Sequence, residues 1–315
     1  YTEGTAHLAG PYQGAPLSLA ILAPATAGPY VLGTIVVSTA LRVDPETARI
    51  DAVSDPIPAI LEGIPLDVRS VQVRLDKPQF TFNGTSCDPL AITGSLLSDL
   101  GQTAGLQKPF QLGECAALAF KPKLSLRLRG GTRRGANPAL RAVLGMPEGG
   151  ANPRSLSVAL PHSEFLDQAH IGTVCTRVQF AAAPGNGAQC PAASVYGHVS
   201  VKAPLFSSAP FEGQAYLRSS DHKLPDLLLA LHGPPELPIA VDLDGRIDSF
   251  HGGIRTSFES LPDVPFSEAV LTMAGGHKGL LQNSRNICAK ANRATVAAEG
   301  QNGKASDSKP ALKAR

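Results

Sequence analysis

The side chains best suited to chemistry lie in the middle of the chain, where His162, His170, Cys175 and His198 follow one another. A cysteine beside histidines can act as a nucleophile, and the four side chains together could bind a metal. Their spacings match no common pattern of metal ligands, however, and Cys175 has a nearby partner in Cys190. The sequence therefore predicts that these residues are structural and that the chain is not an enzyme.

A second group of candidates is acidic, because Asp242, Asp244 and Asp248 surround Gly245. Carboxylates so close in sequence could bind calcium. A calcium loop of the EF-hand type needs acids at its first, third and fifth positions and glycine at its sixth, and this pattern is absent. We therefore keep the three aspartates as weak metal candidates, expect no other cofactor, and favour a strand with a tight Asp-Gly turn.

The remaining signals exclude several classes of function. The motifs of serine hydrolases, nucleotide-binding loops, zinc proteases and dinucleotide-binding folds do not occur in the sequence. The formal charge is +2 and no apolar run is as long as a membrane span, so we expect neither a nucleic-acid partner nor a membrane span. Tryptophan is absent and aromatic residues make up 5% of the chain, which weakens the case for carbohydrate binding.

The five cysteines indicate an oxidising compartment, so the protein is predicted to be secreted, either extracellular or at the cell surface. We expect two disulfides, Cys87–Cys115 and Cys175–Cys190. Cys288 is left over, and we expect it to be unpaired, to bond another chain, or to bond a cysteine of a longer parent chain.

The strongest signal of organisation is an internal duplication. A first unit, residues 1–115, and a last unit, residues 205–315, repeat the same order of apolar, glycine and charged positions. The corresponding positions are 3–8 with 212–217, 18–22 with 227–231, 42–44 with 246–248, Ile50 with Ile254, and Cys87 with Cys288.

Short strands are predicted along most of the chain, because its 31 glycines and 27 prolines are typical of strands joined by tight turns. Apolar and polar residues alternate at 68–75, 123–129 and 195–201, which predicts strands there. A middle segment, residues 116–204, carries the one helix signal. Ser163 as N-cap, with Glu164 and Asp167 behind it, predicts a helix at about 163–182, ended by the turn-forming residues 183–187.

From these elements we predict an all-β chain of three tandem Ig-like sandwich domains. Their bounds are 1–115, 116–204 and 205–315. The middle domain should carry the short helix, tethered by the disulfide between Cys175 and Cys190.

Four stretches of the sequence resemble a family of large, secreted, uncharacterised bacterial repeat proteins. They are residues 166–171 (Leu-Asp-Gln-Ala-His-Ile), the segment from Cys175 to Gly197, residues 216–220 (Tyr-Leu-Arg-Ser-Ser) and residues 300–303 (Gly-Gln-Asn-Gly). The resemblance covers essentially the whole chain and implies tandem β-sandwich domains behind a signal peptide. It implies no catalytic or binding residues.

The function that this reasoning favours is that of an extracellular structural or surface-array protein, such as a fibre, a sheath or an adhesin stalk. Its partners would be copies of itself or neighbouring repeats, joined by strands shared between subunits. The alternative is a secreted glycan- or protein-binding module, with a groove around Tyr196, His198 and His222. The third reading is a hydrolase with an unfamiliar site near His162 and His170.

Overall fold

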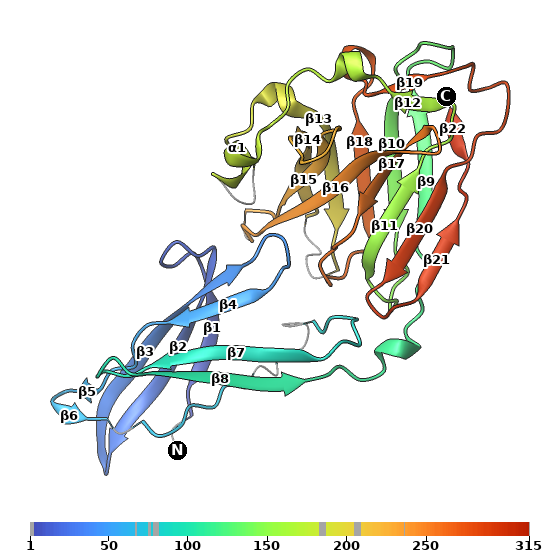
Figure 1. The fold of residues 1–315 in the computed structure, drawn as a ribbon. Helices are drawn as coiled ribbons and strands as arrows, with labels where there is room; N and C mark the ends of the chain where they lie inside the picture. Colours follow the sequence, from blue (N-terminus) through green and yellow to red (C-terminus); the bar gives the residue numbers. More distant parts are fainter. Residues whose placement is uncertain are drawn as a thin grey trace.

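The computed structural model describes residues 3–66, 68–74, 77, 82–182, 187–204, 209–235 and 237–314. Strands dominate, and helices are confined to short segments (Figure 1). The prediction of a mostly β chain is therefore confirmed.

Residues 123–314 build a curled sheet of twelve strands. The strands are β9 (Lys123–Arg129), β10 (Ala139–Gly145), β11 (Pro153–Ala159), β13 (Val195–Lys202), β14 (Phe211–Arg218), β15 (Asp226–His232), β16 (Ala240–Phe250), β17 (Gly253–Phe258), β18 (Glu268–Met273), β20 (Thr295–Gly300), β21 (Ala305–Ser308) and β22 (Leu312–Ala314). Their spatial order is β21-β20-β11-β17-β16-β15-β14-β13-β18-β10-β9-β22. All neighbours are antiparallel except β22 and β9, which are parallel.

The sheet curls because its inner face is apolar and its strands bury that face against one another. In β15, alternate residues Leu227, Leu229 and Leu231 belong to the main core. Leu228 and Ala230 point the other way and are buried as well, beneath Cys175 and Phe180. β15 is therefore a continuous apolar run, as is typical of a strand covered on both faces.

Near the C-terminus, the edge strand β22 bonds to the segment that precedes β20. The Leu312 N–H donates to the Asn292 carbonyl at 2.8 Å, and the Ala294 N–H donates to the Pro310 carbonyl at 3.0 Å. Because residues 292–294 lead directly into β20, these bonds connect β22 with the opposite side of the sheet. The outer edge of β22 is thus partly paired.

The first unit forms a separate set of strands. β1 (Thr5–Ala9), β2 (Leu17–Ala27), β3 (Tyr30–Val43) and β4 (Ile50–Ser54) make an antiparallel sheet in sequence order. Two hairpins follow, β5 (Ile60–Leu61) with β6 (Ile64–Pro65), and β7 (Leu90–Leu97) with β8 (Thr103–Phe110). In Figure 1 this unit is blue to teal and lies against one end of the curled sheet.

The second and third predicted domains, 116–204 and 205–315, share one sheet. Strands of the middle segment and of the last unit alternate within the curled sheet, and β13 pairs directly with β14. The structure therefore shows one large curled sheet for residues 123–314, and the tandem Ig-like sandwiches stay a prediction.

Residues 68–74, expected to be a strand, form none, and position 75 lies outside the described residues.

The predicted helix over 163–182 is wrong for most of its length. Residues Glu164–Leu166 form a strand, β12, which pairs with β19 (Leu281–Asn283), and Gln168–His170 form a short 3-10 turn. The only α-helix in the described residues is α1, Arg177–Ala181, which begins with a capping box between Thr176 and Gln179. A partner strand more than a hundred residues away decides the conformation of Glu164, and a local capping pattern could not reveal it.

The Asp-Gly turn is also wrong, because β16 passes through Asp244 and Gly245 without a break. A Cβ atom on Gly245 would lie 2.8 Å from the Phe258 ring. The glycine therefore permits close packing between strands, and the turn comes later, at His251 and Gly252.

Among the described residues, no helix is long and apolar enough to cross a membrane.

Candidate functional site: an apolar cavity inside the curled sheet

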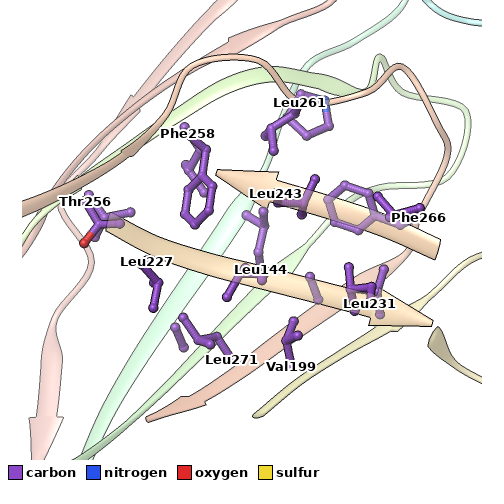
Figure 2. A pocket seen from close by; sticks show the side chains of 18 of the residues that line it. Leu144, Val199, Leu227, Leu231, Leu243, Thr256, Phe258, Leu261, Phe266 and Leu271 are labelled. Carbon is purple, nitrogen blue, oxygen red and sulfur yellow. The ribbon is translucent and has the colours of Figure 1, made fainter. Parts of the chain in front are cut away.

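The curled sheet encloses a cavity of about 650 Å³. Side chains from most of its strands line it, and Figure 2 shows how they point inward from facing strands. The labelled ones are Leu144, Val199, Leu227, Leu231, Leu243, Thr256, Phe258, Leu261, Phe266 and Leu271. Folded interiors contain few voids larger than a water molecule, so a space of this size is a feature of the fold that needs an explanation.

The cavity is closed at one end by the ribbon of β12 and β19. Leu166 and Leu281 are cross-strand partners and both line the cavity. Asp167 holds this ribbon in place, since its carboxylate accepts hydrogen bonds from the Asn137 and Gln282 side chains, each at 2.9 Å. This end is therefore a fixed wall.

The opposite end is covered by the first unit. Val43, Ala48, Ile50 and Phe82 line the cavity there, together with the loop at 261–266. The connection between β3 and β4 touches β16 directly, because the Pro45 carbonyl accepts a hydrogen bond of 2.8 Å from the Asp242 N–H. The mouth of the cavity thus lies between the first unit and the curled sheet.

The lining carries almost no polarity. Thr256 and Asp263 are its only polar side chains among the described residues. Asp263 accepts four hydrogen bonds, from the Thr85 and Ser86 N–H groups, the Thr85 hydroxyl and the Asn152 amide. Its oxygens therefore already have hydrogen-bond partners, and no cationic side chain of the described residues lines the space.

A buried carboxyl lies beside the closed end but does not line the cavity. Glu164 is fully buried, and no hydrogen-bond partner reaches its oxygens. Burial raises the pKa of this carboxyl to about 7, although the nearby Ser163 hydroxyl and the Arg285 guanidinium lower it. Asn283, directly opposite on β19, leaves its side-chain oxygen without a partner as well.

The predicted cysteine pairs are bonded in the structure, Cys87 with Cys115 and Cys175 with Cys190. Cys175 is buried against Phe180 and Tyr216, so the second disulfide fixes the segment that covers the outer face of β14 and β15. Cys288 is exposed and makes no disulfide within the chain.

The three weak metal candidates do not converge. Asp244 pairs with Arg218 at 2.6 Å, and Asp248 pairs with Arg255. The side-chain hydrogen bond from Arg255 holds the pKa of the Asp248 carboxyl below its usual value. Asp242 is buried beneath the β3–β4 connection. Across the part of the chain that the structure describes, no three His, Cys, Asp or Glu side chains are grouped to hold a metal.

The histidines are also dispersed. His170 lies 2.9 Å from the Gly279 carbonyl, and His222 lies 2.8 Å from an Asp226 oxygen, on another part of the sheet. Tyr196 and His198 do meet, in a second hollow of about 400 Å³. The Tyr196 hydroxyl, however, accepts a hydrogen bond from the Gly172 N–H at 2.9 Å, and the side chain is 3% exposed. Tyr196 is therefore part of the scaffold.

Sequence reasoning missed the cavity itself. The alternating apolar residues of strands such as β9 indicated an inner face, but the volume enclosed depends on how twelve strands curl together.

Comparison of the chain with models of protein families, with curated proteins and with solved structures gives no match.

Proposed function

We propose that the protein binds a neutral apolar molecule, such as a lipid chain or another hydrocarbon, inside the curled sheet. The observation that carries this proposal is the cavity of about 650 Å³ with an apolar lining. Binding sites for small molecules commonly measure roughly 300–1,000 Å³ and are mostly apolar. Water inside an apolar lining finds few hydrogen-bond partners, so an apolar occupant displaces no well-bound water.

The charges around the cavity favour a neutral occupant. No lysine, arginine or histidine of the described residues lines it, and Asp263 is occupied by its four hydrogen bonds. An ionised carboxylate or phosphate inside the sheet would be desolvated without a partner, which costs several kcal/mol. A fatty acid anion therefore fits less well than a hydrocarbon or a neutral lipid.

The proposal is tested with N-phenyl-1-naphthylamine, a neutral fluorophore that brightens in apolar surroundings. We expect saturable binding, and at least about tenfold weaker binding after Leu243→Trp, which fills part of the cavity. Val178→Trp adds the same group at an exposed site on α1 and should leave the affinity unchanged. Binding that is equal in both variants would place the fluorophore outside the cavity.

A second candidate is the structural assembly expected from the sequence, in which modules share strands. The observation that favours it is the outer strand β4, which has no neighbour beyond it in the described residues and whose Val53 is exposed. Unpaired strand edges are ready templates for pairing with another chain. Such an assembly would lie outside the cell, where the two disulfides are stable.

The assembly is tested by sedimentation over a range of protein concentrations. We expect oligomers whose fraction rises with concentration and falls when Leu8→Lys and Val53→Lys add charges at exposed positions of β1 and β4. A chain that remains monomeric at every concentration would remove this candidate and leave ligand binding untouched.

A further inference from the structure

The two repeat units share one strand order. β1 to β4 form an antiparallel sheet in which each strand pairs with the next, and β14 to β17 form the same arrangement. Later in each unit a hairpin follows, β7–β8 in the first and β20–β21 in the last. Gly4 and Gly213 also correspond, since a Cβ atom at either one would collide with a carbonyl oxygen of the next strand. The backbone thus supports the duplication seen in the sequence.

The units differ in the strands that the middle segment contributes. In the last unit, β13 pairs with β14, β11 pairs with both β17 and β20, and β18 pairs with β10 and β13. In the first unit, no strand of the described residues lies on the outer edges of β1 and β4. Residues 70–73, the counterpart of β18, form no strand.

Burial at corresponding positions differs in the same way. Leu217 on β14 is 0% exposed, whereas its counterpart Leu8 on β1 is 54% exposed. Ile254 on β17 is 8% exposed, whereas its counterpart Ile50 is 64% exposed. Both units carry apolar side chains at these positions. Neighbouring strands bury them in the last unit, whereas in the first unit they stay largely exposed, although Ile50 lies at the mouth of the cavity. The first unit therefore presents an apolar face without the strands that cover the corresponding face of the last unit.

We propose that the first unit is completed by a further β module of the kind formed by residues 116–204. Its strands add to the free edges of β1 and β4 as β13 and β11 add to β14 and β17. Main-chain hydrogen bonds provide the pairing, and the apolar inner faces provide the fit. The middle segment of a second copy is not the partner, because its β11 and β13 already pair with its own last unit.

This inference goes beyond ligand binding and is distinct from the second candidate function, because it assigns the edges of β1 and β4 to an added segment and not to a second copy of the chain. It is tested by fusing a second copy of residues 116–211 directly before Glu3 of the full chain. Because Glu212 is the counterpart of Glu3, the fusion reproduces the spacing from β13 to β14. We expect hydrogen exchange at the outward amides of β1 and β4 to slow by at least about tenfold relative to the unfused chain.

The matched control is the same fusion with Val199→Pro in the added copy only. Proline removes a donor from the strand that should lie beside β1, so protection of β1 should be lost. Exchange in β15 serves as an internal check that the curled sheet remains folded. Equal exchange of β1 in the fusion, the control and the unfused chain would overturn the inference.

A second measurement uses Leu8→Asp in both backgrounds. In the unfused chain Leu8 is exposed, so the substitution should shift the melting temperature little. In the fusion Leu8 is buried and the same substitution should abolish the protection of β1. If Leu8→Asp has no effect in the fusion, the added module does not cover this face and the inference fails. Self-association of the unfused chain would then leave the second candidate standing on its own.

Discussion

At the scale of the residue, Glu164 is a fully buried carboxyl without a hydrogen-bond partner, and burial raises its pKa from 4.5 to about 7. The unfolded chain releases this proton at lower pH than the folded one. Stability contributed by the protonated group is therefore fully present below about pH 4.5 and is lost as the pH rises through about 7. We expect Glu164→Gln to be more stable than the wild type at pH 8, by on the order of 3 kcal/mol, and similar to it at pH 4.5.

The measurement is thermal unfolding followed by circular dichroism between pH 4.5 and pH 8. The control is Glu268→Gln, because Glu268 is an accessible carboxylate paired with Lys202 at 3.1 Å. Surface pairs of this kind contribute about 0–1 kcal/mol, so the control should not change the pH dependence. A Glu164→Gln variant that is less stable than the wild type at pH 8 would show that the charged carboxylate has a partner in solution.

At the scale of the element, the close approach of β14 and β15 depends on Gly213. A Cβ atom there would lie 2.8 Å from the Ala230 carbonyl carbon and 2.9 Å from the Leu231 Cα, and backbone cannot rotate out of the way. We expect Gly213→Ala to lower the free energy of unfolding by about 1–3 kcal/mol, measured by urea denaturation. Gly94→Ala is the control, since a Cβ atom on Gly94 of β7 meets nothing within 4 Å. A control variant that loses as much stability as Gly213→Ala would show that close approach is not the cause.

Elements whose signals are local could be predicted from the sequence. The strands at 123–129 and 195–201 alternate in polarity, and β9 and β13 occupy these positions. The helix at 163–182 failed because β19 pairs with β12, and that pairing joins residues more than a hundred positions apart. The strand at 68–75 shows the opposite case, since its alternation is present but the described residues offer it no partner. Alternation therefore predicts which residues can form a strand, and tertiary pairing decides which do.

The candidate site could not be predicted for a related reason. An inner face was visible as alternating leucines in β9, but the same pattern suits a sandwich core that is fully packed. The cavity arises only when twelve strands curl around one interior. Sequence motifs of catalytic and metal sites consist of polar residues, whereas the lining of this cavity is almost entirely apolar.

At the scale of the whole molecule, one carboxylate connects the first unit to the curled sheet. Asp263 precedes β18 and binds the Thr85 and Ser86 N–H groups and the Thr85 hydroxyl, while the Asn152 amide donates to the same carboxylate. Charge-assisted bonds of this type are stronger than neutral ones. Since Val43 and Ile50 of the same unit line the mouth of the cavity, Asp263 also links the closure of the cavity to the position of the first unit.

We therefore expect Asp263→Ala to free the first unit without unfolding the curled sheet. The Thr85 and Ser86 amides should exchange at least about tenfold faster, and bound N-phenyl-1-naphthylamine should dissociate faster because the mouth is less covered. Hydrogen exchange and stopped-flow fluorescence measure the two effects, and Asp307→Ala, at an exposed position on β21, is the control. Faster amide exchange with an unchanged dissociation rate of the fluorophore would show that Asp263 holds the first unit but does not control the closure of the cavity. The first unit would then be tethered by Asp263, and ligand would leave by another route through the sheet.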